Sequence, residues 1–140
     1  HERYPWLVAA QDGEVGGLAC GKTFNPRAAY DWTAEVSVYL REGLQGQGIG
    51  SLLYGALIPA LDAQGYRCLV SGITTPNEAS VRLHERFGLR HLGTLERVGY
   101  KMGAWRSVGS WQRLAGPLDD AGPAPILPVS AVCSTVESNT

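Results

Sequence analysis

The stretch Gln45-Gly46-Gln47-Gly48-Ile49-Gly50 decides the fold, because a strand-like run precedes it and a helical run follows it. Residues 32–40 are rich in the β-branched and aromatic side chains that favour strands. Residues 51–64 repeat leucine and alanine at helical spacing, and Gly65 is a natural helix stop. A strand, a glycine-rich turn and a helix form a ready anion site, because backbone N–H groups and the positive end of the helix dipole point at the turn.

The rest of the chain predicts an α/β fold with a mixed sheet. We expect further strands over 6–10, 15–24, 68–73, 90–98 and 105–114, and a second helix that starts around 75–77 and ends at Gly88. This order of strands and helices predicts a mixed sheet with at least two helices on its faces. After Leu114 the composition changes to proline, alanine, serine and aspartate. We therefore expect a core over 1–114 and a Pro-rich, extended or disordered tail over 115–140, of which residues 125–129 could dock on the core.

Composition excludes several classes of function. With 140 residues, 44% of them hydrophobic, and a net charge of −1, the chain predicts one domain without a broad electrostatic footprint for nucleic acid or an anionic membrane. No apolar run approaches the roughly 20 residues that span a bilayer, and the first residues do not follow the plan of a secretory signal. Cys20, Cys68 and Cys133 are odd in number and widely spaced, which argues against a disulfide framework or a zinc site and indicates a reducing compartment, the cytoplasm.

Two further glycine patterns are weaker. Residues 16–23 match the Walker A pattern GxxxxGK(S/T) letter for letter. A phosphate-binding loop of that kind needs a helix that starts at the lysine, here Lys22, and Asn25-Pro26 follow too closely to extend one. We interpret this segment as a glycine-rich strand. The GxGxG spacing of residues 46–50 lacks the third glycine of a dinucleotide-binding fingerprint.

Two motifs in the right order resemble those of a known family. Gln45-x-x-Gly48-x-Gly50 after a strand is similar to the acetyl-coenzyme A signature, R/Q-x-x-G-x-G/A, of the GNAT N-acetyltransferase superfamily, and residues 77–89 resemble its second block, NxxSxxLxExxGF. The segments 2–8, 29–35, 83–85 and 101–109 are similar to the phosphinothricin N-acetyltransferase branch. The resemblance covers about residues 2–129 and implies the GNAT acyl-coenzyme A N-acyltransferase fold. We expect the first strand and the helical pair of that fold, which come before the segment starting at Glu2, to be absent from this chain.

The resemblance implies an enzyme that moves acetyl from acetyl-coenzyme A (acetyl-CoA) to the α-amino group of phosphinothricin or a similar amino-acid analogue, with a role in detoxification and herbicide resistance. It implies a small-molecule amine as partner, no metal, no nucleic acid and no membrane; family members are often homodimers, which leaves a homodimer open. Methionine sulfoximine, arsinothricin and a protein N-terminus are alternative acceptors. A non-catalytic acyl-coenzyme A-binding module is the alternative of another class.

The resemblance also assigns site residues. Glu35 matches the general base, which the reaction needs because an amine is protonated at neutral pH; a structural salt bridge is the other interpretation of this acid. His84 matches a histidine proposed to assist proton movement near the reacting sulfur, although a lone histidine on an amphipathic helix is often only packed. Arg27 and Tyr30 match positions that bind the acceptor. The resemblance assigns acetyl-CoA binding to Val38, Tyr39, Leu40, Gly46, Gln47, Gly48, Ile49, Gly50, Ser51 and Asn77.

Overall fold

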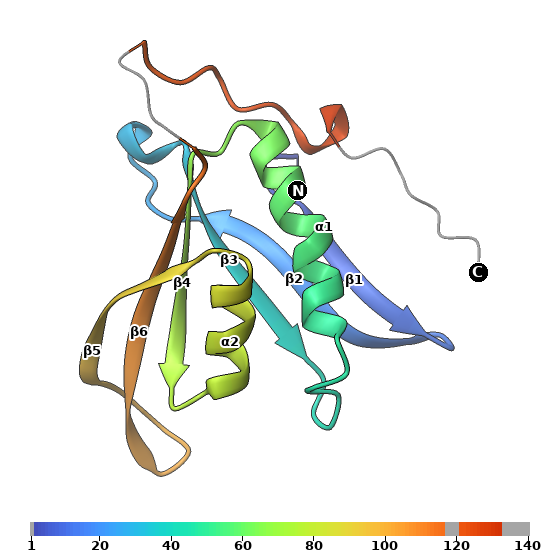
Figure 1. Cartoon of the computed structure of the whole chain (residues 1–140), viewed down its shortest axis with the longest axis vertical. Helices are drawn as coiled ribbons and strands as arrows, with labels where there is room; N and C mark the ends of the chain where they lie inside the picture. The colour runs from blue at the N-terminus through green and yellow to red at the C-terminus, as the bar shows by residue number, and fades with distance from the viewer. Residues whose placement is uncertain (1, 117–120, 133–140) are drawn as a thin grey trace.

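The computed structural model describes residues 2–116 and 121–132. Its centre is one six-stranded sheet with the order β1-β2-β3-β4-β6-β5 (Figure 1). The strands are β1 (Trp6–Gln11), β2 (Glu14–Thr23), β3 (Thr33–Leu40), β4 (Cys68–Thr75), β5 (Arg90–Lys101) and β6 (Ala104–Leu114). All neighbouring strands are antiparallel except β3 and β4, which run parallel. The expected mixed α/β sheet is confirmed.

Two helices, α1 (Ile49–Gln64) and α2 (Glu78–Arg86), lie on the same side of this sheet (Figure 1). In α1 the side chains of Leu53, Leu57 and Leu61 recur at helical spacing and are buried against the sheet. The helix ends at Gly65, whose φ of 106° is the left-handed conformation that glycine adopts without strain. Two short 3-10 helices, η1 (Ala28–Tyr30) and η2 (Val129–Ala131), complete the order of elements in the described residues.

The sheet has two different faces, which the alternation of side chains along β3 makes visible. Ala34 and Val36 are fully buried in the core beneath α1, and we call this side the covered face. Glu35 and Tyr39 point to the opposite side, because successive residues of a strand alternate. On this second side, the open face, no helix packs within the described parts of the chain.

Strands β3 and β4 separate soon after they begin. Their parallel pairing joins Thr33–Glu35 to Cys68–Val70 and stops there, whereas both strands continue for five more residues (Figure 1). Between Val36–Leu40 and Ser71–Thr75 the sheet therefore has a gap. The backbone N–H and C=O groups of β3 that point into this gap have no partner on β4, so an extended ligand can pair with them.

The Walker A pattern of residues 16–23 lies inside β2, and the next element is η1, so no helix begins at Lys22. Without that helix the segment cannot cradle phosphates in the manner of a P-loop. Our interpretation of this segment as a glycine-rich strand is confirmed. Gly17 and Gly21 let α1 pack closely on this strand, because the Cβ of a larger residue at either position would lie 3.0–3.2 Å from side chains such as Leu53 and Leu61 of α1.

The C-terminal segment packs against the C-terminal end of α1. The amide N–H of Leu127 donates to the carbonyl oxygen of Gln64, and Gln64 Nε2 donates back to the Leu127 carbonyl oxygen at 2.9 Å. Ile126 packs against the core, and the Trp32 indole N–H donates to the Ala124 carbonyl oxygen. The expected docking of residues 125–129 is present, while the division into a core and a tail at residue 115 stays a prediction.

Cys20 and Cys68 are free thiols, and Cys133 lies outside the described residues. Within residues 2–116 and 121–132, we find no helix with the length and apolar character that a membrane span requires.

Candidate active site

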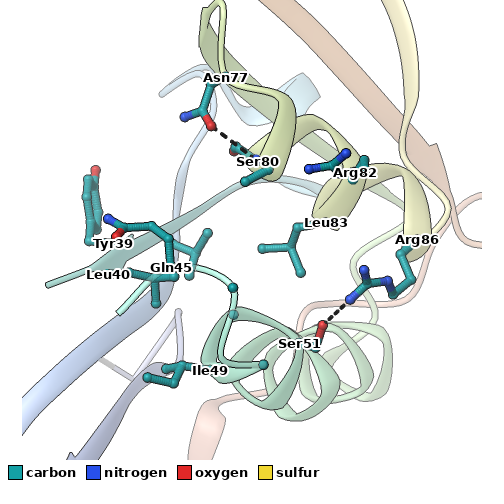
Figure 2. A pocket seen from close by; sticks show the side chains of 15 residues that line it. Tyr39, Leu40, Gln45, Ile49, Ser51, Asn77, Ser80, Arg82, Leu83 and Arg86 are labelled. Atoms are coloured by element: carbon teal, nitrogen blue, oxygen red, sulfur yellow. Dashed lines mark hydrogen bonds between the residues drawn. The ribbon is translucent and has the colours of Figure 1, made fainter. Parts of the chain in front are cut away.

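A cavity of about 620 Å³ lies where the gap between β3 and β4 meets the start of α1 and one side of α2 (Figure 2). Four parts of the chain form its walls: the end of β3, the glycine loop, the start of α1 and one side of α2. The lining residues are Val38, Tyr39, Leu40, Gln45, Gly46, Gly48, Ile49, Gly50, Ser51, Asn77, Ala79, Ser80, Arg82, Leu83 and Arg86. Nine of the ten residues expected to bind acetyl-CoA therefore border one space. Gln47 is the exception, since its side-chain amide turns back to the carbonyl oxygen of Gly43.

The glycine loop exposes backbone N–H groups to this cavity. Gly46 and Gly48 have φ values of 79° and 80°, a left-handed conformation that is strained for residues with a side chain. Gly48 is also the N-cap of α1, and the first N–H groups of a helix have no partner within it. With the positive end of the helix dipole, these groups form an anion site.

Helices α1 and α2 approach each other closely at the cavity wall. A Cβ built on Gly50 would lie 2.9 Å from Leu83 Cδ2, so any larger residue there requires the Leu83 side chain to move. One turn further, the Arg86 guanidinium donates a hydrogen bond to Ser51 Oγ (Figure 2). Arg82 lies four residues before Arg86, which places two exposed guanidinium groups on the same side of α2, next to the glycine loop.

Six lining residues were not among the predicted site residues: Gln45, Ala79, Ser80, Arg82, Leu83 and Arg86. Arg82 and Arg86 could have been found from the sequence, because two arginines at i and i+4 on a helix share one side. Asn77 lines the cavity, and its Oδ1 also accepts a hydrogen bond from the Ser80 amide. It therefore caps α2 whatever else it binds.

Glu35 lies at the point where the gap opens. It is the last residue of β3 that pairs with β4, its partner there is Val70, and its half-buried side chain is on the open face. Among the described residues, none forms a hydrogen bond or ion pair with its carboxylate. A structural salt bridge for Glu35 is therefore not seen in this part of the chain.

His84 lies on the covered face and is almost completely buried, with 2% of its surface exposed. Its Nδ1 is 2.7 Å from the Ser80 carbonyl oxygen, and its Nε2 is 2.8 Å from the Tyr54 hydroxyl and 3.0 Å from Ser71 Oγ. A carbonyl oxygen can only accept, so Nδ1 carries the proton and Nε2 accepts a hydrogen bond from one of the two hydroxyl groups. Burial lowers the pKa of His84, which favours the neutral imidazole over the charged form.

Tyr54 is fully buried, and burial raises the pKa of its phenol. It therefore stays protonated and is suited to donate to His84 Nε2. The three side chains Tyr54, Ser71 and His84 come from α1, β4 and α2, so they connect the elements on either side of the gap. Neither Glu35 nor His84 is among the residues that line the cavity.

The two residues expected to bind the acceptor lie in the loop between β2 and β3. Arg27 is exposed and directly precedes η1, and Tyr30 is the last residue of η1, with its ring edge-on to Phe24 at a centroid distance of 6.0 Å. Neither residue borders the cavity. Within the described residues, no group of three or more His, Cys, Asp or Glu side chains is placed to hold a metal ion.

Comparisons with known proteins agree with this geometry. The chain is 47% identical over 131 residues to the phosphinothricin N-acetyltransferase of Streptomyces viridochromogenes, which covers 94% of this chain and 69% of that protein. It is 41% identical over 119 residues to an L-methionine sulfoximine/L-methionine sulfone acetyltransferase of Pseudomonas paraeruginosa, covering 84% of this chain and 69% of that protein.

A similar fold is present in a GNAT superfamily phosphinothricin acetyltransferase from Sinorhizobium meliloti, solved in complex with acetyl-CoA. The TM-score is 0.80 and the identity 32%, over 86% of this chain and 66% of that chain. Residues 1–89 match the model of the Acetyltransferase (GNAT) family. With a mixed sheet that opens between its two parallel strands and a glycine loop at the end of the gap, the chain belongs to the GNAT acetyltransferase family.

Proposed function

We propose that this acetyltransferase moves the acetyl group of acetyl-CoA directly to the α-amino group of phosphinothricin or a close amino-acid analogue, in the cytoplasm. The observation that carries the proposal is the end of the β3–β4 pairing at Glu35. It leaves an open strand edge, a cavity beyond it and a carboxylate at its start, the three parts that this reaction needs.

The cavity fits acetyl-CoA by its chemistry. Phosphate groups suit the amides of the glycine loop and the guanidinium groups of Arg82 and Arg86, because charge-assisted hydrogen bonds are the strong ones. Val38, Leu40 and Ile49 offer apolar contact to the chain of atoms between the phosphates and the thioester. The unpaired edge of β3 in the gap offers amide partners to the same chain.

Glu35 and His84 lie on opposite faces of the sheet, next to the start of the gap. Glu35 is on the open face and suits the removal of a proton from the attacking amine, directly or through water. The buried network of Tyr54, Ser71 and His84 is on the covered face, where its hydroxyl groups suit hydrogen bonding to the leaving sulfur. In this assignment the new C–N bond forms as the C–S bond breaks. The proton of the amine goes to Glu35, and the leaving thiolate takes a proton from water.

The choice of acceptor rests on the relatives. One named relative acetylates phosphinothricin and another methionine sulfoximine or methionine sulfone, which are amino acids with a tetrahedral oxidised phosphorus or sulfur atom in the side chain. We assign Arg27 and Tyr30 to contacts with such an acceptor. Arsinothricin and a protein N-terminus stay as alternative acceptors, and a homodimer stays a prediction.

An acceptor screen tests the proposal. Thiol release from acetyl-CoA is followed with phosphinothricin, methionine sulfoximine, methionine sulfone and an unmodified peptide, and without acceptor. We expect the amino-acid analogues to release thiol far faster than the peptide or the blank. Preference for the peptide, or release that no acceptor accelerates, would overturn the assignment of the acceptor.

A further inference from the structure

The Walker A lysine has no role as a P-loop residue, yet its position on β2 is specific. Lys22 is paired with Glu35 across the β2–β3 ladder, so both side chains project from the open face. Its Nζ donates a hydrogen bond of 2.9 Å to the Tyr39 hydroxyl. The hydrogen bond to Tyr39 raises the pKa of Lys22, so the ammonium stays charged at neutral pH.

The direction of the Lys22 side chain places its charge beside the gap. Tyr39 is four residues after Glu35 on the same face, about 13 Å along β3 at the usual rise per residue. The Lys22 and Tyr39 side chains meet between these two positions, and among the described residues the ammonium forms no ion pair with Glu35. Cys20, two residues before Lys22 on the same face, is fully buried although no helix packs on this face within the described residues.

The pair Lys22 and Tyr39 has unused hydrogen-bonding capacity. An ammonium has three donors, and in the described part of the chain only Tyr39 accepts one of them. The Tyr39 hydroxyl accepts from Lys22 and keeps its own proton to donate. Two adjacent donor groups, one of them cationic, suit two oxygens of a single acidic group.

We propose that Lys22, with Tyr39, binds the acidic side-chain group of the acceptor and selects acceptors that carry a negative charge there. This inference rests on the proposed function, because it assumes that the α-amino group lies at Glu35. The ammonium is held by Tyr39, four residues beyond Glu35 on β3, which favours the distal acidic group over the α-carboxylate, because the α-carboxylate is only one carbon away from the amine. Lys22 is thus a specificity residue and takes no part in the transfer step.

Two acceptors make a matched pair for the test. Phosphinothricin and methionine sulfone both end in a tetrahedral atom with two oxygens and a methyl group, but only the phosphinate is charged. Lys22→Met removes the charge and keeps the stem, and Lys22→Arg keeps the charge. Lys101→Met is the control for the loss of a lysine, because Lys101 is exposed at the far end of β5.

We expect Lys22→Met to raise the KM for phosphinothricin by about 10- to 100-fold, the usual worth of a charge-assisted hydrogen bond, with kcat within about threefold. The KM for methionine sulfone should change less than about threefold, Lys22→Arg should recover part of the loss, and Lys101→Met should behave as the wild type. Melting temperature and acetyl-CoA affinity show that the variant is folded. If Lys22→Met changes the KM for both acceptors equally, or changes neither, this inference alone is wrong. If the wild-type enzyme acetylates neither acceptor, the proposed function is wrong.

Discussion

The buried network around His84 allows a quantitative prediction. One lone pair of His84 Nε2 faces two hydroxyl groups, those of Tyr54 at 2.8 Å and Ser71 at 3.0 Å. Tyr54→Phe or Ser71→Ala alone leaves the other hydroxyl to donate, so each should lower the free energy of unfolding by about 0.5–1.5 kcal/mol, the net worth of one hydrogen bond. The double variant leaves Nε2 buried without a donor, which adds a desolvation cost of about 1–3 kcal/mol.

The assay is a double-mutant cycle in denaturant, with the wild type, both single variants and the double variant measured in the same buffer. We expect the double variant to lose at least about 1 kcal/mol more than the sum of the single variants. Additive losses would mean that the two hydroxyl groups do not share one acceptor. The hydrogen bonds at Nε2 of His84 would then no longer support the assignment of the ring proton to Nδ1.

Three further predictions concern the proposed base Glu35, the glycine loop and the pH dependence of stability. Glu35→Gln should lower kcat by about 10²–10⁴-fold with unchanged acetyl-CoA affinity, and near-normal kcat in a folded variant would remove Glu35 from the mechanism. Gly48→Val should weaken acetyl-CoA binding at least tenfold in calorimetry, because valine cannot keep the φ of 80° without strain; unchanged affinity would refute the placement of the loop. Burial lowers the pKa of His84, so the stability that the neutral imidazole contributes is complete above about pH 6.5 and is lost as the pH falls through the folded-state pKa. His84→Gln should therefore flatten the profile of unfolding free energy against pH below about pH 6.5.

The sequence predicted the elements well because hydrophobic periodicity and glycine positions determine them locally. The expected strand over 32–40 is observed at Thr33–Leu40, and its alternation of polar and apolar residues already separates Glu35 from Val36. The expected strand over 90–98 extends to Lys101, because a shift of register near Arg97, whose φ is 50°, lets β5 continue. Such a bulge leaves no pattern in the sequence of one strand.

The sequence did not allow us to predict which residues of distant elements face each other. The loop between β2 and β3 has nine residues, so its length does not fix which residue of β2 faces Glu35. The neighbours of His84 come from α1 and β4, and no local pattern connects a histidine to Tyr54 and Ser71. For the Walker A match the opposite holds: the local pattern is present in the sequence, but the segment is a strand and therefore cannot act as a P-loop.

The distribution of charge agrees with the proposed function, in which acetyl-CoA and the acceptor use opposite sides of one sheet. Arg82 and Arg86 lie at the exposed rim of the cavity, where phosphates can be held without burying an unpaired charge. The network at His84 is deeper and contains only neutral groups, since the histidine is held as Nδ1–H. On the open face, Lys22 and Glu35 are paired across β2 and β3, and the Lys22 ammonium donates to Tyr39 and forms no ion pair with Glu35. In the proposed function, the carboxylate of Glu35 takes the amine and the ammonium of Lys22 takes the acid of the same small molecule. We then expect this molecule to meet the thioester at the gap after Glu35.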